Sequence, residues 1–255
     1  RVHLESSFRS SLGDAVGTLV SKNVPSRLAA GDATLWGVDA EPEASIRVGW
    51  VADPSLMRPL VDDVEELRRA FAAEGVTRFV LCGMGGSSLA PEVMASSAGV
   101  PLEIVDSTHP DHVTQALSGD LRSTAVIVSS KSGTTVETAA ARAAFAEAFQ
   151  GVGIDPTSRI LIVTDPDSPL HKEAAGNGHR VFTADPLVGG RFSALTAFGL
   201  VPATLAGVDT AALLSDAHSA WSALAQDSED NPAVRLAAAL STASRDIAVL
   251  TPGET

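Results

Sequence analysis

Two short segments of the sequence combine glycine with hydroxyl-bearing residues, and both could bind an anion such as a phosphate group. The first, residues 83–88, reads Gly-Met-Gly-Gly-Ser-Ser and is called the glycine segment. The second, residues 129–138, is called the hydroxyl segment; six of its ten residues are Ser or Thr, and it contains Lys131, one of three lysines in the chain. Hydroxyl groups and the N–H groups at the start of a helix donate well to phosphate oxygens. Because the net charge is −13, an anionic ligand would depend on such local donors.

The glycine segment admits three interpretations when it is taken alone. It could bind a sugar phosphate, since glycines let the backbone approach a ligand closely and Ser87 would face an anion at a helix start. It could bind a dinucleotide, because Gly-x-Gly-x-x-Ser approaches the Rossmann fingerprint and Asp106 lies about 20 residues further on. Ser88, however, occupies the third glycine position of that fingerprint. The glycines could also simply form a tight turn.

The hydroxyl segment favours a compact phosphate pocket over an extended dinucleotide site. Helix capping explains one or two hydroxyl residues, but not six in ten. A Walker A pattern is absent from the sequence. Three-residue spacing puts two threonines on one face of the first helical turn, and the lysine adds a cation. The side chains expected to surround the phosphate are those of Ser130, Lys131, Ser132, Thr135 and Thr138.

The elements that must position these segments are strands and helices in alternation. Short apolar, β-branched runs of the kind buried on both faces occur at residues 78–82, 102–105, 125–128 and 159–163, with a weaker fifth at 179–182. An apolar period predicts a preceding amphipathic helix through Leu56, Leu60, Val64, Leu67 and Phe71. Further helices are expected over residues 89–94, 135–150, 192–205, 210–225 and 232–241. The pattern predicts a doubly wound α/β fold with a five-stranded, mainly parallel sheet flanked by helices and with extra helices at both ends.

A third segment, residues 188–193, places Arg191 after two glycines and before a helix; it is called the arginine segment. A fixed guanidinium can stabilise negative charge that develops on a substrate oxygen, and it is charged at every relevant pH. A surface salt bridge is the ordinary alternative for an arginine. The glycines before it and the helix after it favour a positioned group.

The three segments resemble, in this order, those of the phosphoglucose isomerases. The matching residues are Gly83-x-Gly85-Gly86-Ser87, Ser130-Lys131-x-x-Thr134-Thr135-x-Glu137-Thr138 and Val188-Gly189-Gly190-Arg191-Phe192-Ser193. The likeness runs from residue 83 to about residue 203, and general sugar isomerase (SIS) domains share only looser versions of the first two segments. The alanine-rich sequence looks most like the isomerase half of actinobacterial fused transaldolase–isomerase proteins. A flavodoxin-like SIS fold is the expectation.

The resemblance implies an aldose–ketose isomerase that converts glucose 6-phosphate to fructose 6-phosphate through a cis-enediol, without a metal or cofactor. The positions that match the family's phosphate-holding residues are Ser87, Ser130, Lys131, Ser132, Thr135 and Thr138. Gly86 and Gly190 match positions that line the sugar site, Arg191 matches an arginine near the reacting carbons, and Glu137 matches a support for the ring-opening histidine. Glu137 is explained equally well as a carboxylate that complements the helix dipole.

The sequence also departs from the family. Ser132 and Gly133 replace Thr and Phe of the usual Ser-Lys-Thr-Phe-Thr-Thr pattern, and the glycine predicts a more mobile loop. The family's glutamate base, ring-opening histidine and late lysine fall beyond residue 255. We therefore expect the chain alone to be inactive, and the full-length parent to be a homodimer that contributes the histidine across its interface.

The expected organisation has four parts. Residues 1–75 form a helical connecting segment, 76–185 the SIS domain, 186–245 an active-site loop with helices, and 246–255 the start of a further domain, because residues 246–250 read as a strand.

The net charge of −13 argues against a nucleic-acid partner, because phosphate backbones are bound by basic surfaces. No signal peptide or membrane-spanning run is visible, and one cysteine excludes an internal disulfide, so a cytosolic location is expected. Two other classes remain as alternatives: a non-catalytic sugar-phosphate-sensing SIS module and a dinucleotide-binding Rossmann domain.

Overall fold

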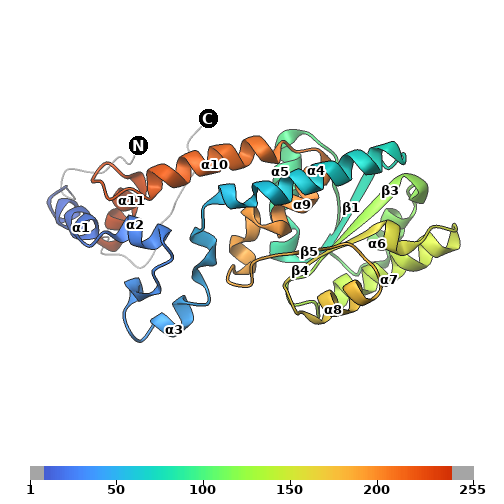
Figure 1. The fold of residues 1–255 in the computed structure, drawn as a ribbon, viewed down its shortest axis with the longest axis horizontal. Coiled ribbons are helices and arrows are strands. Elements are labelled where there is room, and N and C mark those ends of the chain that lie inside the picture. The colour runs from blue at the N-terminus through green and yellow to red at the C-terminus, as the bar shows by residue number, and fades with distance from the viewer. Residues whose placement is uncertain (1–8, 243–255) are drawn as a thin grey trace. The chain divides into compact units, whose positions relative to one another are not determined.

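The computed structural model describes residues 9–242, which are drawn in colour in Figure 1. These residues divide into two compact units. The larger unit comprises Ile46–Trp50 and Pro54–Asp216. The smaller contains the described residues up to Ser45, Val51–Asp53, and those from Ala217 onward. The strand expected over residues 246–250 lies outside the described residues.

The larger unit is built on a five-stranded sheet whose neighbouring strands are all parallel. The strands are β1 (Arg78–Gly83), β2 (Glu103–Val105), β3 (Thr124–Ser129), β4 (Ile160–Thr164) and β5 (Val181–Thr183). Their order, β2-β1-β3-β4-β5, is that of the flavodoxin-like doubly wound sheets. The predicted fold class is therefore confirmed, with a sheet that is wholly rather than mainly parallel.

Successive residues of a strand point to opposite faces of the sheet, so apolar strands present side chains on both faces. Helices cover both of these faces. Phe79 and Leu81 belong to one core, and Val80 and Cys82 belong to the other. The first core includes side chains of α4 (Arg58–Ala73) and α9 (Ala197–Ala206), and α5 (Leu89–Ala98) packs on α9. The second includes side chains of α6 (Pro110–Leu117), α7 (Val136–Gly151) and α8 (Pro169–Gly176) (Figure 1).

The helix predicted from residue 56 begins slightly later than the apolar period suggested. Leu56 lies in a 3₁₀ turn, η4 (Pro54–Met57), and is 67% exposed. The α-helix starts at Arg58, with Pro59 in its first turn, where a missing N–H costs nothing. Val64 and Phe71 then carry the apolar face into the core.

The smaller unit is helical. It contains α1 (Arg9–Ser21), α2 (Val24–Ala29), α3 (Glu41–Ala44) and α11 (Pro232–Thr242), together with the later part of α10 (Thr210–Leu224). Val16 packs with Val234 and Ala238 in a core of its own. Among the helices of residues 9–242, none is both long and apolar enough to cross a membrane.

Candidate functional site

The glycine and hydroxyl segments begin side by side at the carboxyl edge of the sheet. Gly83, the last residue of β1, pairs with Ser129, the last residue of β3. From there the two connections diverge: α5 lies with α9 on one side of the sheet, and α7 packs in the core of the other side. In doubly wound sheets, ligands bind beyond the carboxyl ends of the strands at such a switch point.

The glycine segment turns through a short 3₁₀ helix, η5 (Gly85–Ser87), and lies directly against the arginine segment. Gly85 has a φ of +54°, a conformation that favours glycine. A Cβ on Gly86 would overlap the backbone carbonyl of Gly190. This close approach makes glycine necessary at residue 86 and joins the first and third segments.

Ser193 fastens the same junction. It lies in η8 (Gly190–Leu195), is buried, and donates its hydroxyl hydrogen bond to the Gly190 carbonyl at 2.7 Å. The Gly86 carbonyl also lies within reach of this hydroxyl, at 3.3 Å. The sequence had suggested no role for this serine.

Arg191 is exposed beside this junction. Within residues 9–242, no hydrogen bond or ion pair engages its guanidinium. The salt bridge considered as the ordinary alternative is therefore not formed with any described residue. Nearby, the exposed rings of Phe192 and Trp50 stack with centroids 5.5 Å apart, a contact between distant parts of the sequence that no local pattern reveals.

The hydroxyl segment is organised by its own side chains. Ser130 is buried, donates to the Thr135 hydroxyl at 3.1 Å and accepts from the Gly133 N–H at 3.2 Å. The hydroxyls of Ser132 and Thr134 lie 2.9 Å apart in a second hydrogen bond. Three of the predicted phosphate-holding residues, Ser130, Ser132 and Thr135, therefore lie in one hydrogen-bonded loop.

Gly133 lies in a tightly packed part of the hydroxyl segment. Its φ is +69°, and a Cβ there would lie 2.8 Å from the Leu170 Cβ and 3.1 Å from the Ser168 hydroxyl. Glycine thus lets the loop pack onto the start of α8. The loop is closely packed at this residue, and the greater mobility expected from the glycine stays a prediction.

The first turn of α7 supplies unpaired donors. Within the described part of the chain, the N–H groups of Val136, Glu137 and Thr138 meet no acceptor. These groups and the helix dipole favour an anion at this end of a 16-residue helix. Glu137 lies in this first turn, is half-buried and forms no ion pair with a described residue, a position in which a carboxylate favours the helix dipole.

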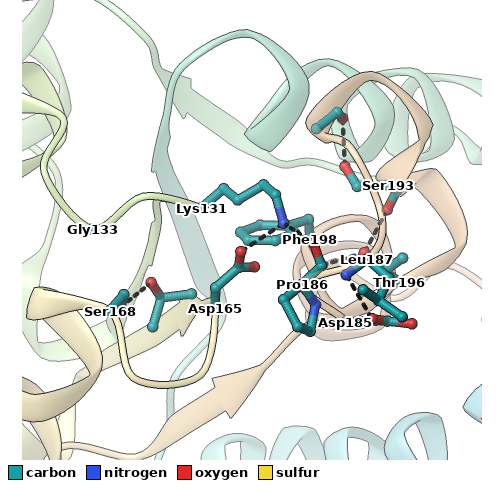
Figure 2. A network of polar contacts seen from close by, with 12 residues as sticks. Lys131, Gly133, Asp165, Ser168, Asp185, Pro186, Leu187, Ser193, Thr196 and Phe198 are labelled. Carbon is teal, nitrogen blue, oxygen red and sulfur yellow. Dashed lines mark hydrogen bonds and ion pairs between the residues drawn. The ribbon is translucent and has the colours of Figure 1, made fainter. Parts of the chain in front are cut away.

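Lys131 is not directed at open solvent. Its ammonium lies 2.6 Å from an Asp165 carboxylate oxygen and donates to the Pro186 carbonyl at 3.4 Å (Figure 2). Side-chain exposures are 26% for Lys131 and 17% for Asp165. Two of its three donors are thus directed at protein acceptors. Asp165, which follows β4, was not foreseen as part of the site.

Thr138 differs from the other hydroxyl residues. It is 3% exposed, and its hydroxyl has no hydrogen-bond partner among the described residues. It lines a cavity of about 50 Å³ together with Arg142 of α7 and Leu170 of α8. Of the predicted residues, Ser87 is half-buried in the glycine segment, and its hydroxyl meets no partner among residues 9–242.

Two residues, Ser88 and Asp106, bear on the alternative of a dinucleotide site. Ser88 is buried and its hydroxyl donates to the Gly85 carbonyl, while Asp106 is exposed just after β2. Across residues 9–242, no group of three or more His, Cys, Asp or Glu residues is arranged to hold a metal ion.

Two known proteins with similar sequences are both glucose-6-phosphate isomerases. A glucose-6-phosphate isomerase of Thermus thermophilus is 36% identical over 188 residues, covering 70% of this chain and 44% of that protein. That of Synechococcus sp. JA-3-3Ab is 35% identical over 232 residues, covering 80% of this chain and 44% of that protein. The chain thus spans less than half the length of these relatives.

Solved structures agree in fold. A hypothetical protein from Thermus thermophilus superimposes with a TM-score of 0.75 at 31% identity, covering 94% of this chain and 57% of that one. A glucose-6-phosphate isomerase from Chlamydia trachomatis gives a TM-score of 0.67 at 24% identity, covering 89% and 49%, which indicates a shared fold. The model of the family described as phosphoglucose isomerase matches residues 51–247, and the chain belongs to this family.

Proposed function

We propose that this chain supplies the sugar-phosphate-binding half of an enzyme that interconverts glucose 6-phosphate and fructose 6-phosphate. The observation that carries the proposal is the contact of Gly86 with Gly190. This contact joins the glycine segment to the arginine segment at the strand edge where the hydroxyl segment also begins. These two contacts support a site in which the donors for a phosphate and a cation for the sugar end lie at the same edge of the sheet.

In this proposal, the phosphate is held by hydroxyl groups and backbone N–H groups. Ser87 contributes from the glycine segment, and Ser130, Ser132 and Thr135 contribute from the hydroxyl segment. The free N–H groups of the first turn of α7, including that of Thr138, complete the cradle. Lys131 contributes through its backbone, because its side chain is paired with Asp165. Gly86 and Gly190 line the sugar through their backbones.

Arg191 has the chemistry that the isomerisation needs. Removal of a proton from the carbon beside a carbonyl leaves negative charge on oxygen, and the resulting cis-enediol is stabilised by a fixed cation. Arg191 is free of protein partners in the described residues, so its charge is available to the substrate. Glu137 would support the ring-opening histidine. The proposed proton transfer uses protein groups, without a metal or cofactor.

The base and that histidine are proposed to lie in the part of the relatives that this chain does not span. The isolated chain should therefore bind sugar phosphates without converting them, because proton transfer requires a base. A homodimeric, cytosolic parent enzyme belongs to the same proposal.

Isothermal titration of the chain with 6-phosphogluconate tests the proposal, with gluconate and NAD as comparisons. We expect binding of 6-phosphogluconate, and at least tenfold weaker binding of gluconate, because a lost set of charge-assisted hydrogen bonds costs at least about 1.4 kcal/mol. Binding of NAD in the absence of any sugar-phosphate binding would overturn it in favour of a dinucleotide site.

A further inference from the structure

The Lys131–Asp165 pair connects two parts of the proposed site that are distant in the sequence. Lys131 belongs to the hydroxyl segment, and its second acceptor, Pro186, lies shortly before the arginine segment. Asp165 lies between them in the chain, immediately after β4. One lysine side chain therefore contacts both the loop after β4 and the connection that leads to Arg191 (Figure 2).

The end of β4 and the residue after it also support the hydroxyl segment, by donating hydrogen bonds to its backbone carbonyls. The Asp165 N–H donates to the Lys131 carbonyl at 3.4 Å, and the Thr164 hydroxyl donates to the Ser130 carbonyl at 2.7 Å. The Thr164 hydroxyl also lies 2.8 Å from that of Ser168, which caps α8. These hydrogen bonds hold the backbone of the hydroxyl segment at Ser130 and Lys131. From there the Lys131 side chain extends toward the arginine segment and contacts Pro186.

The connection that receives Lys131 is itself ordered. Asp185 accepts a hydrogen bond from the Leu187 N–H at 2.8 Å, and the Val188 N–H donates to the Asp185 carbonyl at 3.1 Å. Val188 is buried, and the chain then reaches the Gly190 contact with Gly86. A displacement of Pro186 would be passed to the arginine segment through this short, packed stretch.

Asp165 is poorly explained as a stabilising surface residue. One of its carboxylate oxygens is buried without any hydrogen-bond partner in the described residues. Buried polar atoms are normally satisfied, and an exception calls for another reason to keep the group. Holding Lys131 supplies such a reason, since the half-buried lysine would lose its compensating charge without this carboxylate.

We propose that Asp165 is a positioning residue, which holds Lys131 as a strut between the hydroxyl segment and the arginine segment. This proposal rests on the proposed function for its effect on ligands. The strut sets the distance between the phosphate donors and Arg191, so it matters most for a ligand that contacts both. Inorganic phosphate, which occupies only the cradle, should depend on it less.

The competing role for Lys131 is that of a direct phosphate ligand. Two variants distinguish the two roles by whether ligand binding becomes weaker or tighter. If Lys131 is a strut, Asp165→Asn and Lys131→Met each weaken 6-phosphogluconate binding by about tenfold, as expected for a lost charge-assisted contact, and the double variant is no worse than either single one. Their effect on inorganic phosphate stays within about twofold. If Lys131 instead binds phosphate, Asp165→Asn frees the ammonium and tightens binding of both ligands, which overturns the strut.

Asp63→Asn is the matched control, because it removes one carboxylate from an exposed pair with Arg180. It should leave both affinities unchanged. A second measurement needs no ligand: backbone amide NMR shifts of residues 187–191 should change in Lys131→Met and Asp165→Asn and not in Asp63→Asn. Unchanged amides in a folded Lys131→Met protein would refute the strut. Changed amides in a chain that binds no sugar phosphate would retain the strut and reject the proposed function.

Discussion

The glycine segment and the hydroxyl segment leave neighbouring strands, yet they are held in place by different means. The glycine segment is held mainly by backbone contact: Gly86 lies against the Gly190 carbonyl, and across the junction the Ser193 hydroxyl donates to the Gly86 carbonyl at 3.3 Å. The hydroxyl segment is held by side chains, through the Ser130–Thr135 bond and the Lys131–Asp165 pair. Backbone contact demands a particular residue type, whereas side-chain support depends on partners elsewhere in the chain.

The largest effect is expected at Gly86, where the backbones of the glycine and arginine segments are in direct contact. Gly86→Ala adds a methyl group that overlaps the Gly190 carbonyl, so the arginine segment must shift. We expect a loss of about 3 kcal/mol in unfolding free energy, typical of a severe overpacking change, together with loss of 6-phosphogluconate binding. Urea denaturation and titration calorimetry measure the two effects.

Gly190→Ala provides the control for stability, since a Cβ at Gly190 meets no atom within 4 Å. Its cost should remain below about 1 kcal/mol. Equal destabilisation by the two variants would show that the junction does not depend on close backbone approach.

The hydroxyl segment contains one comparable position. Gly133→Ala combines a positive φ with a methyl group 2.8 Å from Leu170, and we expect a cost of about 2 kcal/mol. Gly153→Ala has a similar φ of +75° but open space around its Cβ, so its cost should be about 1 kcal/mol. The difference between these two values isolates the packing of the loop onto α8, and a zero difference would mean that the loop yields freely.

A smaller effect is expected at Thr138, whose buried hydroxyl has no partner among the described residues. Thr138→Val keeps the shape and removes that hydroxyl, so unfolding free energy should stay constant or rise by up to about 1 kcal/mol. Phosphate affinity should stay within about twofold, because the N–H group is retained. A tenfold loss of affinity in titration calorimetry would make the hydroxyl itself a ligand.

The smallest effect concerns the core beneath both segments. Cys82 is fully buried, and this burial raises the pKa of its thiol to about 12. An unfolded cysteine ionises near pH ~8.5, so the folded chain retains a proton that the unfolded chain loses above that pH. The thiol's contribution to stability is thus complete below pH ~8.5 and declines as pH rises.

Iodoacetamide at pH ~8 should therefore leave folded Cys82 unmodified and should label it in urea. Mass spectrometry follows the labelling. Rapid modification of the folded chain would mean that the sheet edge opens more readily than its packing suggests.

The sheet could be predicted from the sequence to within two residues at each strand end. Parallel strands buried on both faces are continuous apolar runs, as in Thr124–Ser129 and Ile160–Thr164, and such runs are visible without tertiary information. The glycine segment was likewise recognisable, although three interpretations remained open for it alone. Its contact with Gly190 was not, because it depends on how distant loops fold together.

Side-chain partners were the main features that the sequence left hidden. Lys131 was expected to face a phosphate, but its partner Asp165 lies 34 residues away and comes close only through the pairing of β3 with β4. Thr138 is buried beside a cavity that Leu170 of α8 also lines, and this neighbour is distant in the sequence. Ser193 was part of a recognised segment, but its bond to the Gly190 carbonyl requires the local turn of η8.

The most direct test of the central claim is an NMR titration of the isotopically labelled chain with 6-phosphogluconate. If the three segments form one site, the amides of Ser87, of residues 130–138 and of Gly190 and Arg191 will shift together and give a single dissociation constant. Shifts confined to residues 83–88 and Asp106 upon addition of NAD, with no response of any segment to 6-phosphogluconate, would contradict it.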